Sequence, residues 1–414
     1  MPESSTRRAF LGSSLLAAGL AATSRAAAQE TKATPSTPAP AVKIAKVEAL
    51  LLKTDLKRPF GVSVSVPLDK TRTTLLVRIE TDTGVVGWGE TAGLSGTKQA
   101  VEQLGARLIG KNPLEHRLLW RTLWGANFGN PLAVGGLDIA LQDLRGKLLG
   151  LPVHMLYGGR LRDRVPAYAS AMNYVEGEEP EALYPREAEA LVKSGYRALK
   201  MRLGRYPVAR EAKVARAVRD AVGSEVRLMV DGNAAYTLGS ALQMGEVLHD
   251  LQFDFFEEPL PQVAPHYAGY EELRNKLPLP LAGGEGLDSR ASAKELLDRR
   301  AFHIIQPDIS LCGGFGEVLF ISEMAALSGV PCIPHCWGSA ILIAATTHLV
   351  SLLPDPHWGF PTDTPMVEYD QSENPWRTEI VEQPITAKEG FIQVPDTPGL
   401  GLEIREEVVR KYAI

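Results

Sequence analysis

From Val165 onward, short apolar segments alternate with longer amphipathic ones. The apolar segments are VPAYAS, RALKMR, VRLMVDGN, FDFFEEP, LPLAGGE, FHIIQPD and VPCIPHCW, with a weak eighth near His357 to Phe360. Near-continuous apolar runs separated by helices are typical of parallel β/α units, because the strands of such sheets are buried on both faces. Seven or eight units over about 200 residues predict a TIM-like barrel, somewhat more compact than the usual ~250 residues.

The chain before Val165 is organised differently. Residues 42–80 alternate in strand fashion, and Thr83-Gly84 supplies a tight turn before a further strand. Three helical segments are predicted near 97–110, 113–125 and 130–150. Strands followed by helices predict a separate α+β domain. Strand-like and loop-like sequence returns from about Met366, and we expect it to fold back on this first domain.

Composition excludes several classes of partner and scaffold. The 414 residues carry 44 Lys+Arg against 49 Asp+Glu, a formal charge of -5 that provides no broad positive field for nucleic acid. The three cysteines, Cys312, Cys332 and Cys336, are too few for a disulfide-dense scaffold. We therefore expect a small-molecule partner and no nucleic acid.

Residues 1–28 are predicted to be an export leader. Arg7-Arg8 precede an apolar run from Ala9 to Ala22, and small residues at 26–28 suit a cleavage site. The paired arginines resemble a twin-arginine leader, so we expect the periplasm or export. The alternative is an amphipathic core helix, although the run is too short to span a bilayer. Residues 29–42 are predicted to be a linker, and removal of the leader leaves no membrane-like stretch in the mature form.

Ionisable residues follow the apolar strands at their C-terminal ends. Five of them are separated by 26, 28, 23 and 27 residues, each step close to one β/α unit: Asp231, Glu257, Glu285, Asp308 and His335. Lys200 and Arg202 alternate with Met201 and so point to one side of their strand. Consecutive strands therefore direct one ionisable group each toward the same mouth of the barrel. Taken singly, each acid could instead be a helix N-cap.

Three of these carboxylates predict a metal site. Asp231, Glu257 and Glu285 facing one mouth would repel one another unless a cation neutralised them. A set of oxygen ligands without histidine or thiolate selects a hard ion, Mg²⁺ first and Mn²⁺ second.

The chain resembles members of the enolase superfamily, in the mandelate racemase group of the mandelate racemase/muconate lactonizing enzyme family. The likeness extends from Val42 to the C-terminus. Its motifs, in order, are AVGGLDIALQDLRGK at 133–147, Lys200-Met201-Arg202, Val230-Asp231-Gly232-Asn233, Glu257-Glu258-Pro259, Gly284-Glu285, Pro307-Asp308 and His335. Each motif is weak alone, but their order and spacing together are specific.

The resemblance implies an α/β fold in which a TIM-like (β/α)7β barrel carries an α+β N-terminal capping domain. We place the capping domain at 43–164, the barrel at 165–365, and a C-terminal segment that packs back on the capping domain at 366–414. The resemblance also implies one Mg²⁺ per subunit on Asp231, Glu257 and Glu285, and a homo-oligomer.

The same resemblance assigns catalytic roles around a small carboxylate substrate. Asp308 and His335 form the catalytic dyad, and Glu368 bonds the substrate carboxylate. His335 takes the proton next to that carboxylate, while Mg²⁺, Lys200 and a protonated Glu368 stabilise the developing charge.

Arg202 marks a departure from the racemases of the family. Their Lys-x-Lys form places a second lysine as base on the opposite face, whereas an arginine essentially cannot deprotonate. With one competent base, loss of water from a sugar acid is the favoured outcome. Arg202 is then expected to bind a substrate oxygen or a distal carboxylate, and Asn233 the hydroxyl near the metal. Phe60, in a lid segment at 56–67, is expected to contact the distal end of the substrate.

Other interpretations stay open at this point. A racemase or epimerase on the same scaffold is the runner-up, and an exported binding protein without turnover is the alternative of another class. A muconate cycloisomerase is disfavoured, because that group is typified by a lysine pattern on the sixth strand, where this chain has Asp308. Among single residues, His335 could be a core histidine, Glu368 a surface acid, and Glu258 a structural one. Cys336 is a packing thiol, a nucleophile without an evident base, or a disulfide partner of Cys312.

Overall fold

The structure, a computed structural model, describes residues 42–125, 129–263, 266–355 and 365–414. The predicted leader at 1–28 and all of the linker except Val42 lie outside these residues, as does the weak apolar segment near His357 to Phe360. Within the described residues, no helix is both long and apolar enough to cross a bilayer.

The N-terminal domain is an antiparallel sheet covered by helices. Its strands are β1 (Ile44–Gly61), β2 (Asp69–Thr81) and β3 (Val86–Thr91). Its helices are α1 (Thr97–Gly105), α2 (His116–Trp124) and α3 (Pro131–Leu149), with a 3-10 turn at Ala106–Leu108. These elements confirm the α+β capping domain that the sequence predicts.

Close packing of α3 on β3 explains the recurring glycines of the third strand. A Cβ added at Gly89 would lie 2.1 Å from the Gly136 carbonyl oxygen, and one at Gly87 would lie 2.3 Å from the Ala140 carbonyl oxygen. Any side chain there would force the helix off the sheet. The helix begins where the Asn130 side chain accepts a hydrogen bond from the Ala133 N–H at 3.1 Å, with Pro131 in its first turn.

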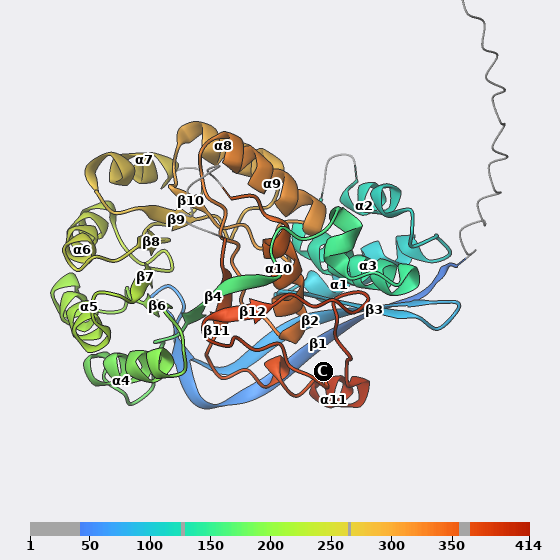
Figure 1. Ribbon diagram of the computed structural model, residues 1–414, viewed down its shortest axis with the longest axis horizontal. Helices are drawn as coiled ribbons and strands as arrows, with labels where there is room; N and C mark the ends of the chain where they lie inside the picture. The colour runs from blue at the N-terminus through green and yellow to red at the C-terminus, as the bar shows by residue number, and fades with distance from the viewer. Residues whose placement is uncertain (1–41, 126–128, 264–265, 356–364) are drawn as a thin grey trace, which may run out of the picture. The chain divides into compact units, whose positions relative to one another are not determined.

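The C-terminal domain is a parallel barrel surrounded by helices (Figure 1). Its named strands are β4 (Arg164–Ser170), β6 (Ala198–Arg202), β7 (Arg227–Asp231), β8 (Phe255–Glu257), β9 (Leu281–Gly283), β10 (Ile304–Ile305) and β11 (Val367–Asp370). Its helices are α4 (Pro180–Lys193), α5 (Val208–Val222), α6 (Leu238–Asp250), α7 (Tyr267–Lys276), α8 (Arg290–Arg299), α9 (Phe315–Leu327) and α10 (Ala340–Leu352). The order β10-β9-β8-β7-β6-β4-β11 confirms the predicted α/β barrel.

Two elements of the barrel differ from the prediction. The segment at 330–337 makes only an isolated bridge to β10, with hydrogen bonds of 3.0 Å from Ile305 N to the Pro331 carbonyl and from Ile333 N to the Ile305 carbonyl. Pro331 and Pro334 lack N–H donors, so a longer ladder cannot form. The strand beside β4 is β11, which pairs with it in parallel, so the barrel extends to Asp370 rather than ending at 365.

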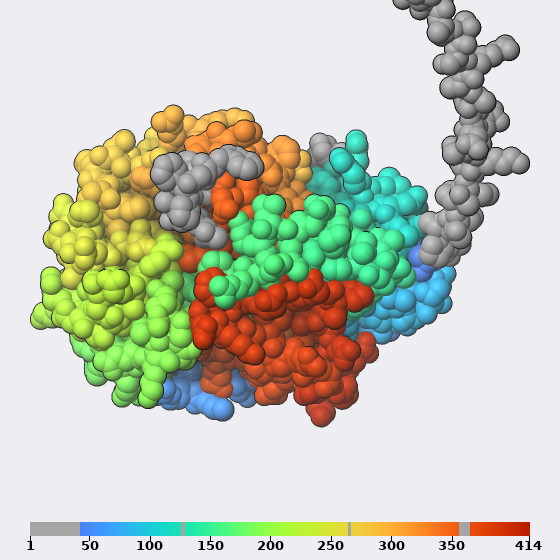
Figure 2. All heavy atoms as spheres, in the orientation of Figure 1, coloured from blue at the N-terminus to red at the C-terminus, as the bar shows by residue number. Residues whose placement is uncertain are grey.

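The remainder of the chain returns to both domains. Strand β12 (Phe391–Gln393) pairs antiparallel with β4, and helix α11 (Glu406–Tyr412) precedes a bridge from Ala413 to Leu52 of β1. Figure 2 shows this C-terminal segment in red, lying against the light-blue residues of the capping sheet. All three cysteines are buried free thiols, so Cys312 and Cys336 form no disulfide.

The capping sheet is fastened to the mouth of the barrel. Short strand β5 (Tyr174–Val175), which follows β4, pairs antiparallel with the end of β1. The lid segment (residues 56–67) is fixed over β6 and β7 by Val64 N, which donates to the Gly204 carbonyl at 3.1 Å, and by the Ser63 hydroxyl, which donates to the Asn233 carbonyl at 3.3 Å. The loop that covers the site is therefore held by contacts far away in sequence.

An apolar plug fills the barrel interior below the site. Eight buried residues, one from each strand position, form a single packed cluster: Tyr168, Ala198, Met229, Phe255, Ala282, Ile304, Ile333 and Met366. Because side chains alternate along a strand, the residue two positions further on also faces inward. The plug therefore fixes the register of the layer above it.

Candidate active site

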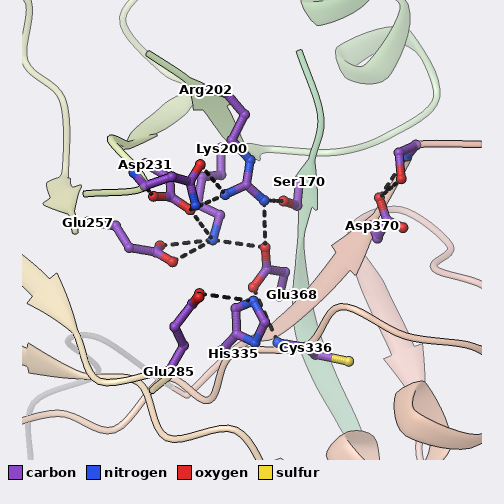
Figure 3. Close-up of polar contacts among 12 residues, drawn as sticks. Ser170, Lys200, Arg202, Asp231, Glu257, Glu285, His335, Cys336, Glu368 and Asp370 are labelled. Carbon is purple, nitrogen blue, oxygen red and sulfur yellow. Dashed lines mark hydrogen bonds and ion pairs between the residues drawn. The ribbon is translucent and has the colours of Figure 1, made fainter. Parts of the chain in front are cut away.

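The layer above the plug is polar at every position except one glycine. Counting two residues on from each plug residue gives Ser170, Lys200, Asp231, Glu257, Gly284, Gln306, His335 and Glu368. All of these side chains are buried, with Lys200 and Asp231 at 0 % exposure. Figure 3 shows most of them converging on one point. A buried layer of this kind must be charge-balanced internally, because water does not compensate it.

The predicted ligand carboxylates come from neighbouring strands. Asp231 on β7 is the register partner of Glu257 on β8, so the two side chains project to the same side. Glu285 lies two residues beyond β9, after Gly284 with φ +115°, a conformation that glycine adopts without strain. In Figure 3, Glu285 approaches the cluster from the side opposite Asp231.

Lys200 and Arg202 from β6 hold these acids together. The Lys200 Nζ donates to both Glu257 oxygens at 2.8 and 2.9 Å and lies 2.8 Å from Glu368 Oε1. Arg202 donates to the Asp231 carboxylate, and its second terminal nitrogen donates to the Ser170 hydroxyl at 3.0 Å. Burial opposes the charge on Lys200, but Glu257 and Glu368 outweigh it and raise the Lys200 pKa.

His335 and Asp308 form a hydrogen-bonded pair. The His335 Nδ1 lies 2.7 Å from Asp308 Oδ2, while Asp308 Oδ1 accepts from the Ser310 N–H at 2.7 Å and from its hydroxyl at 2.6 Å. This carboxylate fixes the ring orientation and leaves Nε2 directed into the site, 3.2 Å from Glu285. Burial disfavours the imidazolium, but Glu285 and Glu368 more than offset it and raise the His335 pKa well above its ordinary value.

Glu368 is a buried member of this cluster, 1 % exposed, rather than a surface acid. Its Oε2 accepts from the Cys336 N–H at 3.3 Å. Burial raises its pKa, but Lys200, His335 and Arg202 together lower it below the usual range. The expectation that Glu368 is protonated is therefore wrong for this arrangement, because three cationic side chains favour its ionised form.

Several other sequence expectations are settled by neighbours of the cluster. Asn233 donates from its amide nitrogen to Asp231 Oδ2 at 3.1 Å, so it positions that carboxylate. Glu258, with φ 41°, is buried and accepts a hydrogen bond from the Gln262 side chain, and it is not bonded to Lys200 or Arg202 in the described part of the chain. Burial raises the pKa of the Cys336 thiol well above its ordinary value, which disfavours a nucleophilic thiolate.

Two polar residues of this layer were not predicted from the sequence. Gln306 donates from Nε2 to Glu257 Oε2 at 3.0 Å. Its side-chain amide oxygen, Oε1, is buried without a hydrogen-bond partner among the described residues. Ser170 orients Arg202, as described above. Both residues are neutral, so a search for ionisable residues after the strands does not detect them. Counting two residues on from each apolar plug residue would have detected them.

The charge balance of the cluster fits a divalent cation. Among the described residues, five carboxylates face three cationic side chains, which leaves two negative charges: Asp231, Glu257, Glu285, Asp308 and Glu368 against Lys200, Arg202 and His335. Burial, together with the neighbouring acids Asp231 and Glu368, raises the Glu257 pKa to about 7, although Lys200 opposes this change. The donor oxygens are of the hard type that Mg²⁺ and Mn²⁺ prefer.

Two of the predicted ligands are bonded to basic side chains in this arrangement. Across the described residues, no three His, Cys, Asp or Glu side chains form a ready cation cage. Lys200 and Arg202 occupy the Glu257 and Asp231 oxygens instead. Asp231, Glu257 and Glu285 are the residues that would hold the ion. Lys200 and Arg202 would then have to share the Glu257 and Asp231 oxygens with it.

A cavity of about 430 Å³ opens between the cluster and the capping domain. On the barrel side it is lined by Asp308, His335 and Trp337. On the capping side, Phe60 and apolar residues of the lid segment line it together with Arg72 of β2. Phe60 is the register partner of Val175 on β5, which fixes its place at the rim. The reactive groups therefore face a space large enough for a small organic acid.

Two family models match this chain. Residues 46–158 match the mandelate racemase/muconate lactonizing enzyme N-terminal domain, and residues 184–408 match the enolase C-terminal domain-like model. The chain belongs to the mandelate racemase/muconate lactonizing enzyme family of the enolase superfamily. It is thus an enolase-superfamily enzyme, and the family implies a divalent metal.

Curated relatives and solved structures agree with this family. The chain is 36% identical to the D-galactarolactone cycloisomerase of Agrobacterium fabrum, over 90% of this chain and 99% of the relative. It is 33% identical to the arabinonate dehydratase of Saccharolobus solfataricus, over 81% and 89%. The 3,6-anhydro-D-galactonate cycloisomerase of Zobellia galactanivorans superposes with a TM-score of 0.79 at 32% identity, over 90% and 99%. These relatives are sugar-acid dehydratases or cycloisomerases.

Proposed function

We propose that this enzyme removes the proton next to the carboxylate of a sugar acid and then eliminates the group on the β carbon, as an acid-sugar dehydratase does. The observation that carries the proposal is the single oriented base. His335 Nε2 is directed into the site by Asp308, whereas the basic residue of β6 nearest the mouth is Arg202, whose guanidinium does not deprotonate. The dehydratases and cycloisomerases among the relatives support the same chemistry.

Each side chain has a definite task in this reaction. A divalent ion on Asp231, Glu257 and Glu285 would supply positive charge for the substrate carboxylate when bound. Lys200 and Arg202 add fixed positive charge within the same buried layer. Glu285 is the first of the acids that raise the His335 pKa, and an ion held by Glu285 would offset its charge and favour the neutral ring. His335 Nε2 would then take the α proton, while Asp308 accepts the Nδ1 hydrogen bond and stabilises the imidazolium that forms. These groups are already oriented, so little reorganisation is needed as charge develops.

The elimination returns the same proton. The α C–H bond breaks, a C=C bond forms between the α and β carbons, and the β C–O bond breaks. His335 then protonates the departing oxygen, which leaves as water, and the resulting enol becomes a 2-keto-3-deoxy acid. One base is sufficient for both transfers, whereas a racemase needs a second base on the opposite face.

Ring opening is a second form of the same elimination. If the departing oxygen belongs to a lactone or anhydro ring, the same bond changes open the ring without release of water. The product is then an isomer of the substrate, which is what a cycloisomerase makes. Two relatives are named as cycloisomerases of such ring compounds, so ring-containing sugar acids belong in the substrate screen.

The test is a screen of purified enzyme with Mg²⁺ against aldonates, aldarates and their lactones, with detection of 2-keto-3-deoxy acids. His335→Asn should lower kcat by about 10²–10⁴-fold, since the base oriented by Asp308 is lost. Exchange of the α proton in D2O without keto acid would support a racemase or epimerase instead. Saturable binding without turnover, unchanged by His335→Asn, would support a non-catalytic binding protein.

A further inference from the structure

The far wall of the cavity carries a cation that the reaction described above does not use. Arg72 of β2 lines the cavity on the capping-domain side, with its side chain 11% exposed. The other charged capping-domain residues of the lining are occupied or peripheral. Glu90 accepts hydrogen bonds from Ser339 and Leu342, and Asp69 is exposed and bonded to Thr71.

Arg72 belongs to a buried cluster of charged side chains. The Arg72 Nη2 donates to Asp370 Oδ2 at 2.9 Å, and Arg377 Nη1 lies 3.1 Å from the same oxygen. Two guanidinium groups therefore share one carboxylate. Burial, and then Arg377, lower the Arg72 pKa, while Asp370 opposes this change. Glu90 also raises the Arg72 pKa, so the two acids Asp370 and Glu90 face the two arginines.

Arg72 also has hydrogen-bonding capacity to spare. Its Nη1 donates to the Ser372 hydroxyl at 2.7 Å and to the Glu373 carbonyl at 3.3 Å, and its Nη2 bonds Asp370. A guanidinium has five N–H donors, so two of them have no partner in the described part of the chain. Such a group can bind a carboxylate without losing its structural contacts.

Trp337 fixes the distance between this wall and the reactive cluster. The Arg72 Cζ lies 5.3 Å and the Arg202 Cζ 5.2 Å from the centre of the Trp337 ring. The two guanidinium carbons are therefore at most about 10.5 Å apart, the sum of these distances. Trp337 lies two residues after His335, so it joins the base to the distal wall.

We propose that Arg72 binds a second carboxylate at the distal end of the substrate, so that the enzyme acts on diacids, open or as their lactones, in preference to monoacids. This inference rests on the proposed function, because it names the substrate class of that site. The carboxylate next to the reacting carbon faces Lys200 and Arg202, and the distal one faces Arg72. Monoacid sugars would leave the spare donors of Arg72 without an anionic partner.

The test compares aldonate and aldarate pairs of the same configuration, such as D-galactonate and galactarate. We expect the wild type to prefer the diacid in kcat/KM. Arg72→Met should lower kcat/KM for the diacid by about 10- to 100-fold, the range for one charge-assisted contact, and leave the monoacid nearly unchanged. Arg377→Gln is the matched control, since it removes a charge from the same cluster without lining the cavity. It should change neither substrate's kcat/KM.

The outcomes separate this inference from the proposed function. Wild-type preference for the monoacid, or an equal loss for both acids in Arg72→Met, would overturn the role of Arg72. If no acid is turned over, the proposed function fails, and calorimetric binding of the same pairs then decides the inference alone. Tighter binding of the diacid that is lost in Arg72→Met supports it, and equal binding of both acids contradicts it. Melting temperatures of the variants check that Arg377 keeps Asp370 paired when Arg72 is replaced.

Discussion

Gln306 shows how much a neutral side chain contributes to this site. Its amide donates to Glu257 Oε2 at 3.0 Å, beside the two Lys200 bonds to the same carboxylate. Partners of this kind orient a ligand carboxylate, and their loss commonly weakens metal affinity or activity by about 10–100-fold. Gln306 is therefore a positioning residue for the predicted metal site.

We predict that Gln306→Leu weakens Mg²⁺ binding by about 10-fold or more, measured by titrating the metal into chelator-treated enzyme. Gln262→Leu is the matched control. It removes the same amide from Glu258, the neighbouring acid that is not an expected ligand. Equal Mg²⁺ affinity in Gln306→Leu and wild type would show that Gln306 does not orient Glu257.

The charged residues of this site could mostly be predicted from the sequence, whereas its neutral residues could not. Asp231, Glu257 and His335 could be predicted because each follows an apolar strand at the spacing of one β/α unit. The alternation of Lys200 and Arg202 also placed them at this mouth, but the sequence did not predict which acids they pair with, because the fold decides those contacts. The ionised state of Glu368 likewise depends on three cations that only the fold brings together.

At the scale of elements, Glu90 joins the two domains through a helix end. This residue of β3 is 1 % exposed and accepts from the N–H groups of Ser339 at 2.8 Å and Leu342 at 3.0 Å, at the start of α10. An acid at a helix N-terminus satisfies N–H groups that have no partner within the helix. The contact also fixes the loop that carries Trp337.

We predict that Glu90→Ala lowers the free energy of unfolding by about 3 kcal/mol, because buried donors lose their acceptor. Glu90→Gln keeps one acceptor oxygen and should lose clearly less. Urea unfolding of the three proteins measures both differences. Similar losses for Ala and Gln would mean that the charge, and not the hydrogen bonding, stabilises the start of α10.

The barrel elements that were hardest to predict were those with polar residues or prolines at positions where other strands have apolar residues. Strand β11 (Val367–Asp370) has Glu368 and Asp370 facing inward, so it lacks the apolar run that identified other strands. The segment at 330–337 has the apolar run, but its prolines prevent the ladder. The long helix α3 and strand β2, which have strong periodicity, were predicted close to their observed bounds. Strand β1 was not, because it continues to Gly61 through residues that were expected to form the lid loop.

At the scale of the whole molecule, the predicted role of residues 1–28 as an export leader can be tested by measuring export. We propose that the Arg7-Arg8 pair directs the folded protein across the inner membrane of its host. Replacing both arginines with lysine should leave the protein in the cytoplasmic fraction, measured by fractionation with antibody detection. Export of the double variant at the wild-type level would contradict a twin-arginine route.

The base of the barrel contains two buried histidines that couple stability to pH. His348 of α10 is 0% exposed, and its Nε2 lies 3.3 Å from the Leu400 carbonyl. Its ring lies 5.5 Å from that of His154, with Arg160 and Asp396 nearby. Burial and then His154 lower the His348 pKa to about 3, so the folded protein keeps this ring neutral.

This depressed pKa gives a defined pH dependence. An unfolded histidine takes up a proton near pH 6.5, whereas folded His348 does so only near its pKa of about 3. Between these values the unfolded chain binds more protons, so stability is fully present above about pH 6.5 and falls as the pH is lowered. We predict that His348→Gln destabilises the protein at pH 7.5, through loss of packing and of the contact with Leu400. The difference in unfolding free energy between wild type and His348→Gln should then narrow toward pH 5, by up to about 1.4 kcal/mol per pH unit. Urea unfolding at pH 7.5, 6.5, 5.5 and 5 measures this difference, and parallel stability curves for the two proteins would show that folding does not lower the His348 pKa.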